Sequence, residues 1–185
     1  MNRKLESFIE LLQGEFNNAE QFKQEQEKGN LNFPFAKHKN TICNSKIEGL
    51  PLDYKGIFML EESYYQIKDK TNAQPHLFCF MEEEDKIKLI SYEMPKEYTK
   101  ETFQYQNLTK MKFDELKISE KFTPAMYTFE DGVWQGGSVS MFTPVLKFSL
   151  FEKFSKEQLE VSETMEVNGK KTFGYDVPII YKRIQ

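Results

Sequence analysis

The fold class of this chain follows from residues 56–67, GIFMLEESYYQI. Its side chains alternate with a period of two, which is the pattern of a β-strand. Two sets face opposite ways in this pattern: Phe58, Leu60, Glu62 and Tyr64 on one side, and Ile57, Met59, Glu61, Ser63 and Tyr65 on the other. Because large apolar residues occupy both sets, the pattern predicts a strand that is partly buried on both faces.

Further along the chain, turn residues separate other runs with the same strand-like alternation. Strand-like runs at 76–81 and 86–94 flank the acidic residues 82–85, which predicts a hairpin with a charged four-residue loop. Asp-Gly at 131–132 and Asn-Gly at 168–169 are strong signals for two-residue hairpin turns. About eight to ten strands joined by short turns indicate a closed meander, because closure removes the exposed edges of the sheet.

A helical pattern precedes the strands. Apolar residues recur there at helical spacing: Leu5, Phe8, Ile9, Leu12 and Phe16. This predicts an amphipathic helix from about residue 3 to 13, ended by Gly14. Residues 22–32 are polar and aperiodic and fit either a second helix or a loop, and residues 109–122 predict one or two helical turns. The sequence thus predicts a mainly β fold, an antiparallel lipocalin-like β-barrel of the calycin kind with a short N-terminal helix.

Composition limits the class of protein. The 185 residues suit one domain, residues 1–185, and the 15% of aromatic residues favours strands. The net charge is −4 and the charges are interspersed, so no basic stripe exists and nucleic acid is not an expected partner. No apolar run is long enough to cross a bilayer and the N-terminus has no apolar signal region, so we expect a cytoplasmic protein without a membrane partner. Its two cysteines, Cys43 and Cys79, are expected to be reduced.

Short catalytic motifs are absent. The sequence has no GxGxxG, no GxxxxGK[ST], no GxSxG, no CxxC and no HExxH, which excludes several common enzyme classes. Two histidines, His38 and His76, cannot form a three-histidine metal site, and packed or surface roles are the expected ones for them. We therefore predict no metal site and no cofactor.

Glu61 and Glu62 interrupt an otherwise apolar strand. Adjacent strand residues point to opposite faces, so one of the two carboxylates should face inward. A carboxylate inside a barrel is costly unless it is paired. The inward one, whichever of the two it is, is therefore a candidate for a ligand-orienting or proton-transferring group. The alternative is a barrel-mouth residue or a salt bridge at an edge.

Several aromatic residues are candidates for the wall of a cavity. Tyr65, Tyr92 and Trp134 are the ligand-binding candidates among them, since an amphipathic ring can both pack on a planar ligand and donate a hydrogen bond to it. Packing in the core is the alternative for each. Gly136-Gly137 after Trp134 indicates a bulge or a close approach of two backbones.

Four stretches resemble the CpcT/CpeT-type chromophore lyases, which help attach bilins to phycobiliprotein cysteines. LLQGEFNNAEQ (11–21) resembles the family's G-x-F-x-N-x-x-Q opening, and PLDYKGIFMLEE (51–62) resembles a stretch that leads into a Glu-Gln pair. QPHLFCF (74–80) lies where the family has Pro-Tyr-Arg-Gln-Arg, and KKTFGYDVPIIYKR (170–183) resembles its closing motif.

Individual positions match the family in part. Glu61 matches the family's Glu and Pro75 its Pro, whereas His76 stands for its Tyr and Leu77 for its first Arg. The resemblance implies a barrel that holds a linear tetrapyrrole beside Glu61, Pro75 and His76 and attaches it to a cysteine of a client protein through a C–S bond. It also implies that Glu61, rather than Glu62, is the catalytic candidate. Lys68 or Arg183 would then replace the missing basic partner of the propionates. The alternatives are a non-catalytic lipocalin-like carrier of a small hydrophobic ligand and a filled barrel that acts as an interaction module.

Overall fold

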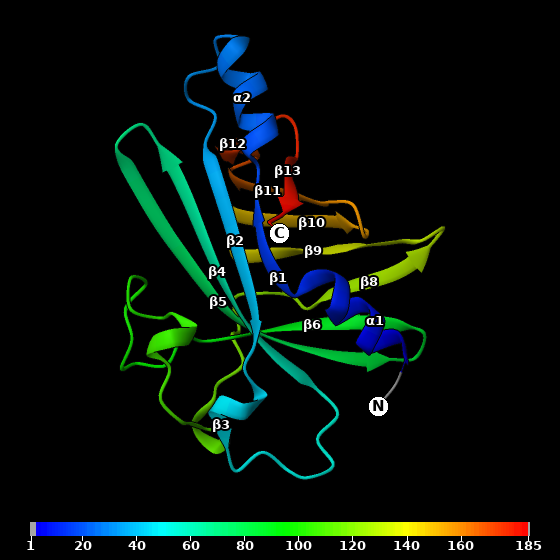
Figure 1. Cartoon of the computed structure of the whole chain (residues 1–185). Helices are drawn as coiled ribbons and strands as arrows, with labels where there is room; N and C mark the ends of the chain where they lie inside the picture. Colours follow the sequence, from blue (N-terminus) through cyan, green and yellow to red (C-terminus); the bar gives the residue numbers. More distant parts are fainter. Residues whose placement is uncertain (1–2, 185) are drawn as a thin grey trace.

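The structure of the protein is a computed structural model that describes residues 3–184. Ten strands form a closed antiparallel β-barrel (Figure 1): β1 (Gly14–Asn17), β2 (Phe35–Ile42), β4 (Ile57–Ile67), β5 (Lys70–Glu83), β6 (Lys86–Tyr92), β8 (Ala125–Glu130), β9 (Val133–Thr143), β10 (Leu146–Phe154), β11 (Leu159–Val167) and β13 (Ile179–Arg183). Each strand pairs with the next along the chain, and β13 pairs with β1 to close the ring. The predicted mainly β, lipocalin-like barrel is therefore confirmed.

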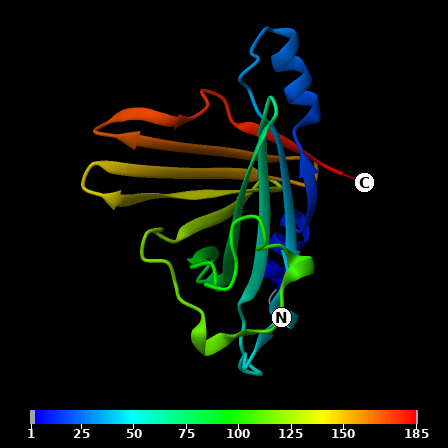
Figure 2. The ribbon, with the colours of Figure 1, turned by 90° about the vertical axis from the view of Figure 1, so that its left-hand side faces the viewer.

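Three short strands lie outside the ring. β12 (Lys170–Gly174) extends β11, and β3 (Ile47–Glu48) pairs in parallel with β7 (Met111–Lys112). Figure 2 shows β9, β10 and β11 running across the direction of β2 and β4.

The predicted turns are confirmed in two of three hairpins. Asp131 and Gly132 turn between β8 and β9 with φ angles of 50° and 81°, and Asn168 and Gly169 turn between β11 and β12 with φ angles of 52° and 75°. Positive φ at both central residues suits the right-handed twist of the flanking strands. The four-residue acidic loop is wrong, because β5 extends to Glu83 and leaves a two-residue turn in which Glu84 has a φ of 57°.

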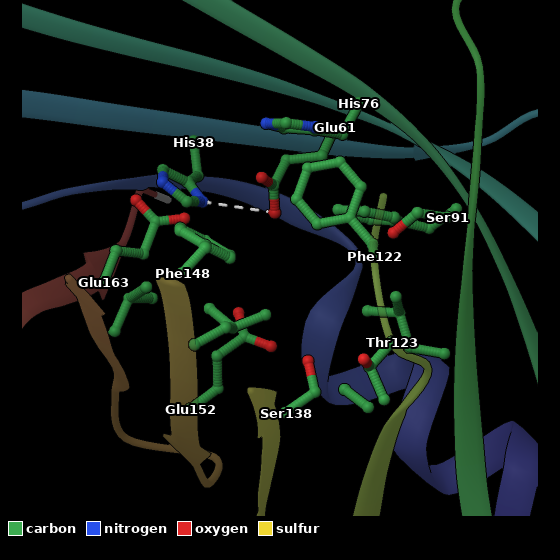
Figure 3. Close-up of a pocket in the computed structure, with 15 residues that line it drawn as sticks. His38, Glu61, His76, Ser91, Phe122, Thr123, Ser138, Phe148, Glu152 and Glu163 are labelled. Carbon is green, nitrogen blue, oxygen red and sulfur yellow. Dashed lines mark ion pairs between the residues drawn. The ribbon is translucent and has the colours of Figure 1, made fainter. Parts of the chain in front are cut away.

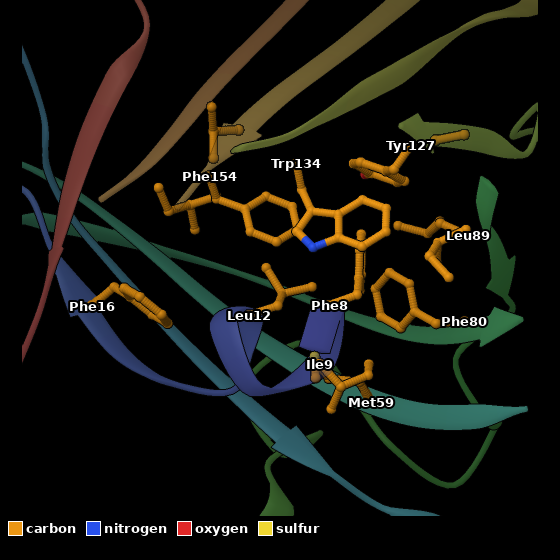
Figure 4. Packing of buried hydrophobic residues seen from close by; sticks show 14 of the residues in the cluster. Phe8, Ile9, Leu12, Phe16, Met59, Phe80, Leu89, Tyr127, Trp134 and Phe154 are labelled. Atoms are coloured by element: carbon orange, nitrogen blue, oxygen red, sulfur yellow. The ribbon is translucent and has the colours of Figure 1, made fainter. Parts of the chain in front are cut away.

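Helix α1 (Arg3–Leu12) closes one end of the barrel, as Figure 4 shows. Its apolar side is buried, and the ring of Phe8 lies 5.0–5.2 Å from four aromatic rings: Phe80, Tyr127, Trp134 and Phe154. The predicted N-terminal helix is confirmed, and Gly14 follows it with a φ of 132°. Residues 19–27 form the second helix, α2 (Ala19–Glu27). No helix among residues 3–184 is long and apolar enough to span a membrane.

A second apolar core lies outside the barrel. Residues 93–124 cross the outer face of β4 and β5, where Phe58, Leu60 and Leu77 pack against residues from that segment: Phe103, Leu108 and Met111. Strand β4 is therefore buried on both faces, as its alternation predicted. Two single turns, η2 (Tyr105–Asn107) and η3 (Phe113–Glu115), are the helical content of this segment. Cys43 and Cys79 are buried in it as free thiols.

Candidate functional site

The barrel interior contains a cavity of about 40 Å³ between the core at α1 and the opposite end. Its lining combines polar and apolar side chains: His38, Glu61, His76, Phe78, Leu89, Ser91, Phe122, Thr123, Ala125, Ser138, Phe148, Leu150, Glu152, Val161 and Glu163. A cavity of this size holds a few water molecules or one end group of an organic ligand.

A larger cleft lies at the open end of the barrel, and we call it the mouth cleft. Its volume is about 520 Å³, and its lining comes from the β4–β5 hairpin and the end of β12: Tyr65, Ile67, Lys68, Asp69, Lys70, Asn72, Gln74, Phe173 and Tyr175. A smaller space lies between the cleft and the cavity, because it shares Tyr65 and Phe173 with the cleft and Glu163 with the cavity. The cleft has the size of typical small-molecule sites.

His38 on β2 and Glu61 on β4 form an ion pair in the cavity (Figure 3). His38 Nδ1 lies 3.4 Å from Glu61 Oε2, and the Ser63 hydroxyl donates to Glu61 Oε1 at 2.9 Å. Burial by itself raises the pKa of Glu61, but the His38 imidazole outweighs it and lowers that pKa to about 2. Burial likewise lowers the pKa of His38, yet the Glu61 carboxylate raises it overall. Each residue of the pair therefore favours the charged form of the other.

Two further carboxyl groups face the same cavity. Glu152 on β10 is 6% exposed and accepts a hydrogen bond from the Tyr127 hydroxyl, while Glu163 on β11 accepts one from the Tyr65 hydroxyl at 3.3 Å. Burial and the nearby negative charge of Glu61 raise the pKa of Glu152 to about 7, and burial also raises the pKa of Glu163. Among the described residues that line the cavity, no Lys or Arg balances these groups.

The structure separates the two neighbouring glutamates of β4. Glu61 lines the cavity, whereas Glu62 faces outward and accepts hydrogen bonds from the Tyr105 backbone N–H at 3.2 Å and the Tyr64 hydroxyl at 3.1 Å. The prediction that one carboxylate of the pair faces inward is confirmed. Glu62 anchors the segment that covers the second core, which is a structural task.

Two other predicted site residues lie near Glu61. His76 pairs with Glu61 across β4 and β5, lines the cavity, and has its pKa lowered by burial. Tyr65 stands at the entrance to the cavity and at the edge of the mouth cleft.

The remaining three predicted site residues lie elsewhere. Pro75 pairs with Glu62 and shares its outward face. Tyr92 packs on Phe58 in the second core, with ring centroids 5.2 Å apart. Trp134 is 1% exposed in the core against α1, where residues 3–184 offer its indole N–H no hydrogen-bond partner. These positions form no part of the cavity.

Sequence reasoning passed over Glu152 and Glu163. Glu152 lies in LKFSLFEKF (146–154) and Glu163 in LEVSETMEV (159–167), and each of these two residues takes an inward position of an alternating strand. This is the same signal that singled out Glu61, namely a carboxylate in an apolar register. His38, expected to be structural, is a member of the cavity's ion pair.

The chain matches no protein family, and no curated protein is similar to it. The fold and the geometry of the cavity are therefore the basis for a functional proposal. The resemblance to the CpcT/CpeT-type lyases stays a prediction.

Proposed function

We propose that this protein is a lipocalin-like carrier of a small, partly apolar molecule, with the body of the ligand in the mouth cleft and a polar end in the cavity. The observation that carries the proposal is the set of ionisable groups around the cavity: His38, Glu61, His76, Glu152 and Glu163. Burying such groups costs free energy, and well-packed apolar residues of similar size are often as stable or more stable. A barrel whose only task is to fold gains nothing from them.

The dimensions of the two spaces support this division of the ligand. The cavity of about 40 Å³ takes an end group, and the mouth cleft of about 520 Å³ takes a larger body. Tyr65, Phe173 and Tyr175 offer aromatic surface to a planar or aliphatic body there.

Fluorescence titration with the uncharged apolar probe N-phenyl-1-naphthylamine tests the proposal. Tyr65→Ala should weaken saturable binding about tenfold, since it removes aromatic contact area at the entrance. The adjacent Tyr64 is the matched control, because its hydroxyl bonds to Glu62 on the opposite face of β4. Tyr64→Ala should bind as the unaltered protein does. Absence of saturable binding would leave the filled barrel as an interaction module.

A tetrapyrrole-handling barrel is the second candidate. Lys68 lines the mouth cleft beside Tyr65, where an ammonium group would meet the propionates of a bilin. Arg183 is occupied elsewhere, since its guanidinium donates to the carbonyl oxygens of Gln13 and of Leu11, the latter at 2.7 Å. A bilin would lie in the cleft with one end ring toward Glu61, and the barrel would act by proximity in transfer to a client cysteine.

Absorbance titration with biliverdin tests the second candidate. Saturable binding with a shifted visible band, weakened in both Glu61→Gln and Lys68→Ala, supports a tetrapyrrole ligand. Glu62→Gln serves as the control for Glu61→Gln, because the two residues are adjacent and face opposite ways. Covalent transfer to a client cysteine is then followed by mass spectrometry, and binding of the apolar probe without biliverdin binding favours the carrier.

A further inference from the structure

The cavity holds more acidic than basic side chains. One imidazole, His38, is paired with one carboxylate, Glu61. Glu152 and Glu163 remain, with tyrosine hydroxyl groups as their hydrogen-bond donors. Burial lowers the pKa of His76, so this second imidazole contributes no positive charge near neutral pH. The cavity therefore favours a positively charged guest.

Glu152 also has an unused acceptor. Among residues 3–184 its one hydrogen bond reaches Oε2, from Tyr127, so Oε1 has no partner on a side chain that is 6% exposed and lines the cavity. In Figure 3 the side chain of Glu152 points toward the space between Glu61, Phe148 and Ser138. A carboxylate oxygen that faces the cavity without a donor favours a guest that supplies one.

We infer that the ligand is an organic amine, whose ammonium group enters the cavity past Glu163 and pairs with Glu152 while its apolar body stays in the mouth cleft. This inference rests on the proposed function. The path follows from the lining, since Glu163 lines both the smaller space and the cavity and Glu152 lies further in. An ammonium group supplies the donors that the free carboxylate oxygen lacks.

Other classes of guest fit the cavity less well. No group of three or more metal-ligating side chains suited to a metal ion occurs among the described residues. An anion would meet two unpaired carboxyl groups, and the basic residues at the site, Lys68 and Lys70, lie outside in the mouth cleft. A neutral guest would leave the carboxylates without a counter-charge.

Amine binding is coupled to the ionisation of Glu152. Ionisable groups face its carboxyl from five strands: Glu61 from β4, His38 from β2, His76 from β5, Tyr127 from β8 and Glu163 from β11. Burial raises the pKa of Glu152 to about 7, so the carboxylate form grows as the pH rises from 6 to 8. An ammonium guest stabilises that form, and the proton of Glu152 passes to solvent on binding. Affinity for an amine should therefore rise over this range.

Three probes of one size test the inference by titration calorimetry at pH 6, 7 and 8: benzylamine, benzyl alcohol and benzoate. We expect benzylamine to bind about tenfold more tightly than benzyl alcohol at pH 8, with a smaller ratio at pH 6 and with proton release in two buffers of different ionisation enthalpy. Benzoate should bind most weakly. Glu152→Gln should remove the preference for the amine, and Glu62→Gln should keep it.

The outcomes separate this inference from the proposed function. Equal binding of benzylamine and benzyl alcohol, with saturable binding of N-phenyl-1-naphthylamine, would overturn the amine ligand and leave the carrier intact. An amine preference that persists in Glu152→Gln would overturn the role of this residue. If neither the three probes nor the naphthylamine binds, both the carrier and the amine ligand are overturned.

Discussion

Tyr127 on β8 and Glu152 on β10 are joined by a hydrogen bond that crosses the strand between them. Gly136 on β9 pairs with both residues in the barrel register, so it is the position that the two side chains bridge. A Cβ atom on Gly136 would collide with the carbonyl oxygen of Met126 and lie 2.7 Å from the Cα atom of Tyr127. The close backbone approach that Gly136-Gly137 indicated is therefore present, and it supports the hydrogen bond that holds Glu152.

Gly136→Ala should destabilise the protein by about 2 kcal/mol, because the backbones of β8 and β9 must separate to admit the methyl group. Urea denaturation measures the change in the free energy of unfolding. Gln135→Ala on the same strand is the control, expected within about 0.5 kcal/mol of the original protein. Equal midpoints for Gly136→Ala and the original protein would show that the close approach of the β8 and β9 backbones does not contribute to stability.

The stability of the protein should fall as the pH rises from about 4.5 to 8. Burial raises the pKa of Glu152 from 4.5 to about 7, so the folded state holds a proton that the unfolded state has released in this range. Stability from this group is complete below 4.5 and is lost as the pH passes 7, by about 3 kcal/mol. Thermal unfolding from pH 4.5 to 8 should show a smaller decline for Glu152→Gln than for the original protein. Glu130→Gln, at an exposed position, should leave the decline unchanged.

The His38 imidazole should titrate above the ordinary histidine range, because the carboxylate of Glu61 stabilises its charged form. Glu61→Gln should lower the pKa of His38 below 6.5, since burial is then opposed by less negative charge. NMR of the imidazole ring protons follows both titrations. Glu62→Gln should leave this pKa where it is, and a matching drop in that variant would contradict the placement of the two glutamates.

Phe8→Ala should remove the central contact of α1 with the barrel and cost about 3–5 kcal/mol, the range for a large aromatic residue in a core. The fluorescence of Trp134 should shift to longer wavelength in the native state, because its ring packs on Phe8 and would gain water. Phe151→Ala, at a side chain that is 51% exposed, should change neither quantity appreciably. An unchanged emission maximum in Phe8→Ala would contradict the closure of this end of the barrel by α1.

The fold was predictable because its signals are local. The alternation in residues 56–67 and the Asn-Gly and Asp-Gly turns each depend on only a few neighbouring residues, and the structure contains the strand and both turns. The predicted loop at 82–85 was wrong because charged residues on a solvent-exposed strand face can form backbone pairs between strands as well as apolar residues do. Residues 93–124 have little periodicity of their own, and the surface of β4 and β5 determines where they lie.

The site was predictable only in part. Glu61 stood out as a charged residue in an apolar strand, but its partners come from β2, β10 and β11. Barrel closure brings these strands around one cavity, and no feature within a strand encodes that meeting. The prediction for Trp134 was wrong because the sequence pattern of a large aromatic residue is the same in a core and in a cavity wall.

NMR of methyl groups during addition of N-phenyl-1-naphthylamine tests whether the barrel holds a ligand. Ile67, Val161 and Ile179 line the mouth cleft or the smaller space beside it, whereas Leu60, Leu77 and Leu108 lie in the second core outside the barrel. We expect saturable shifts of the methyl signals of the first three residues and stationary signals from the second three. Shifts confined to the second core, or no shifts at all, would show that the barrel is not the ligand site.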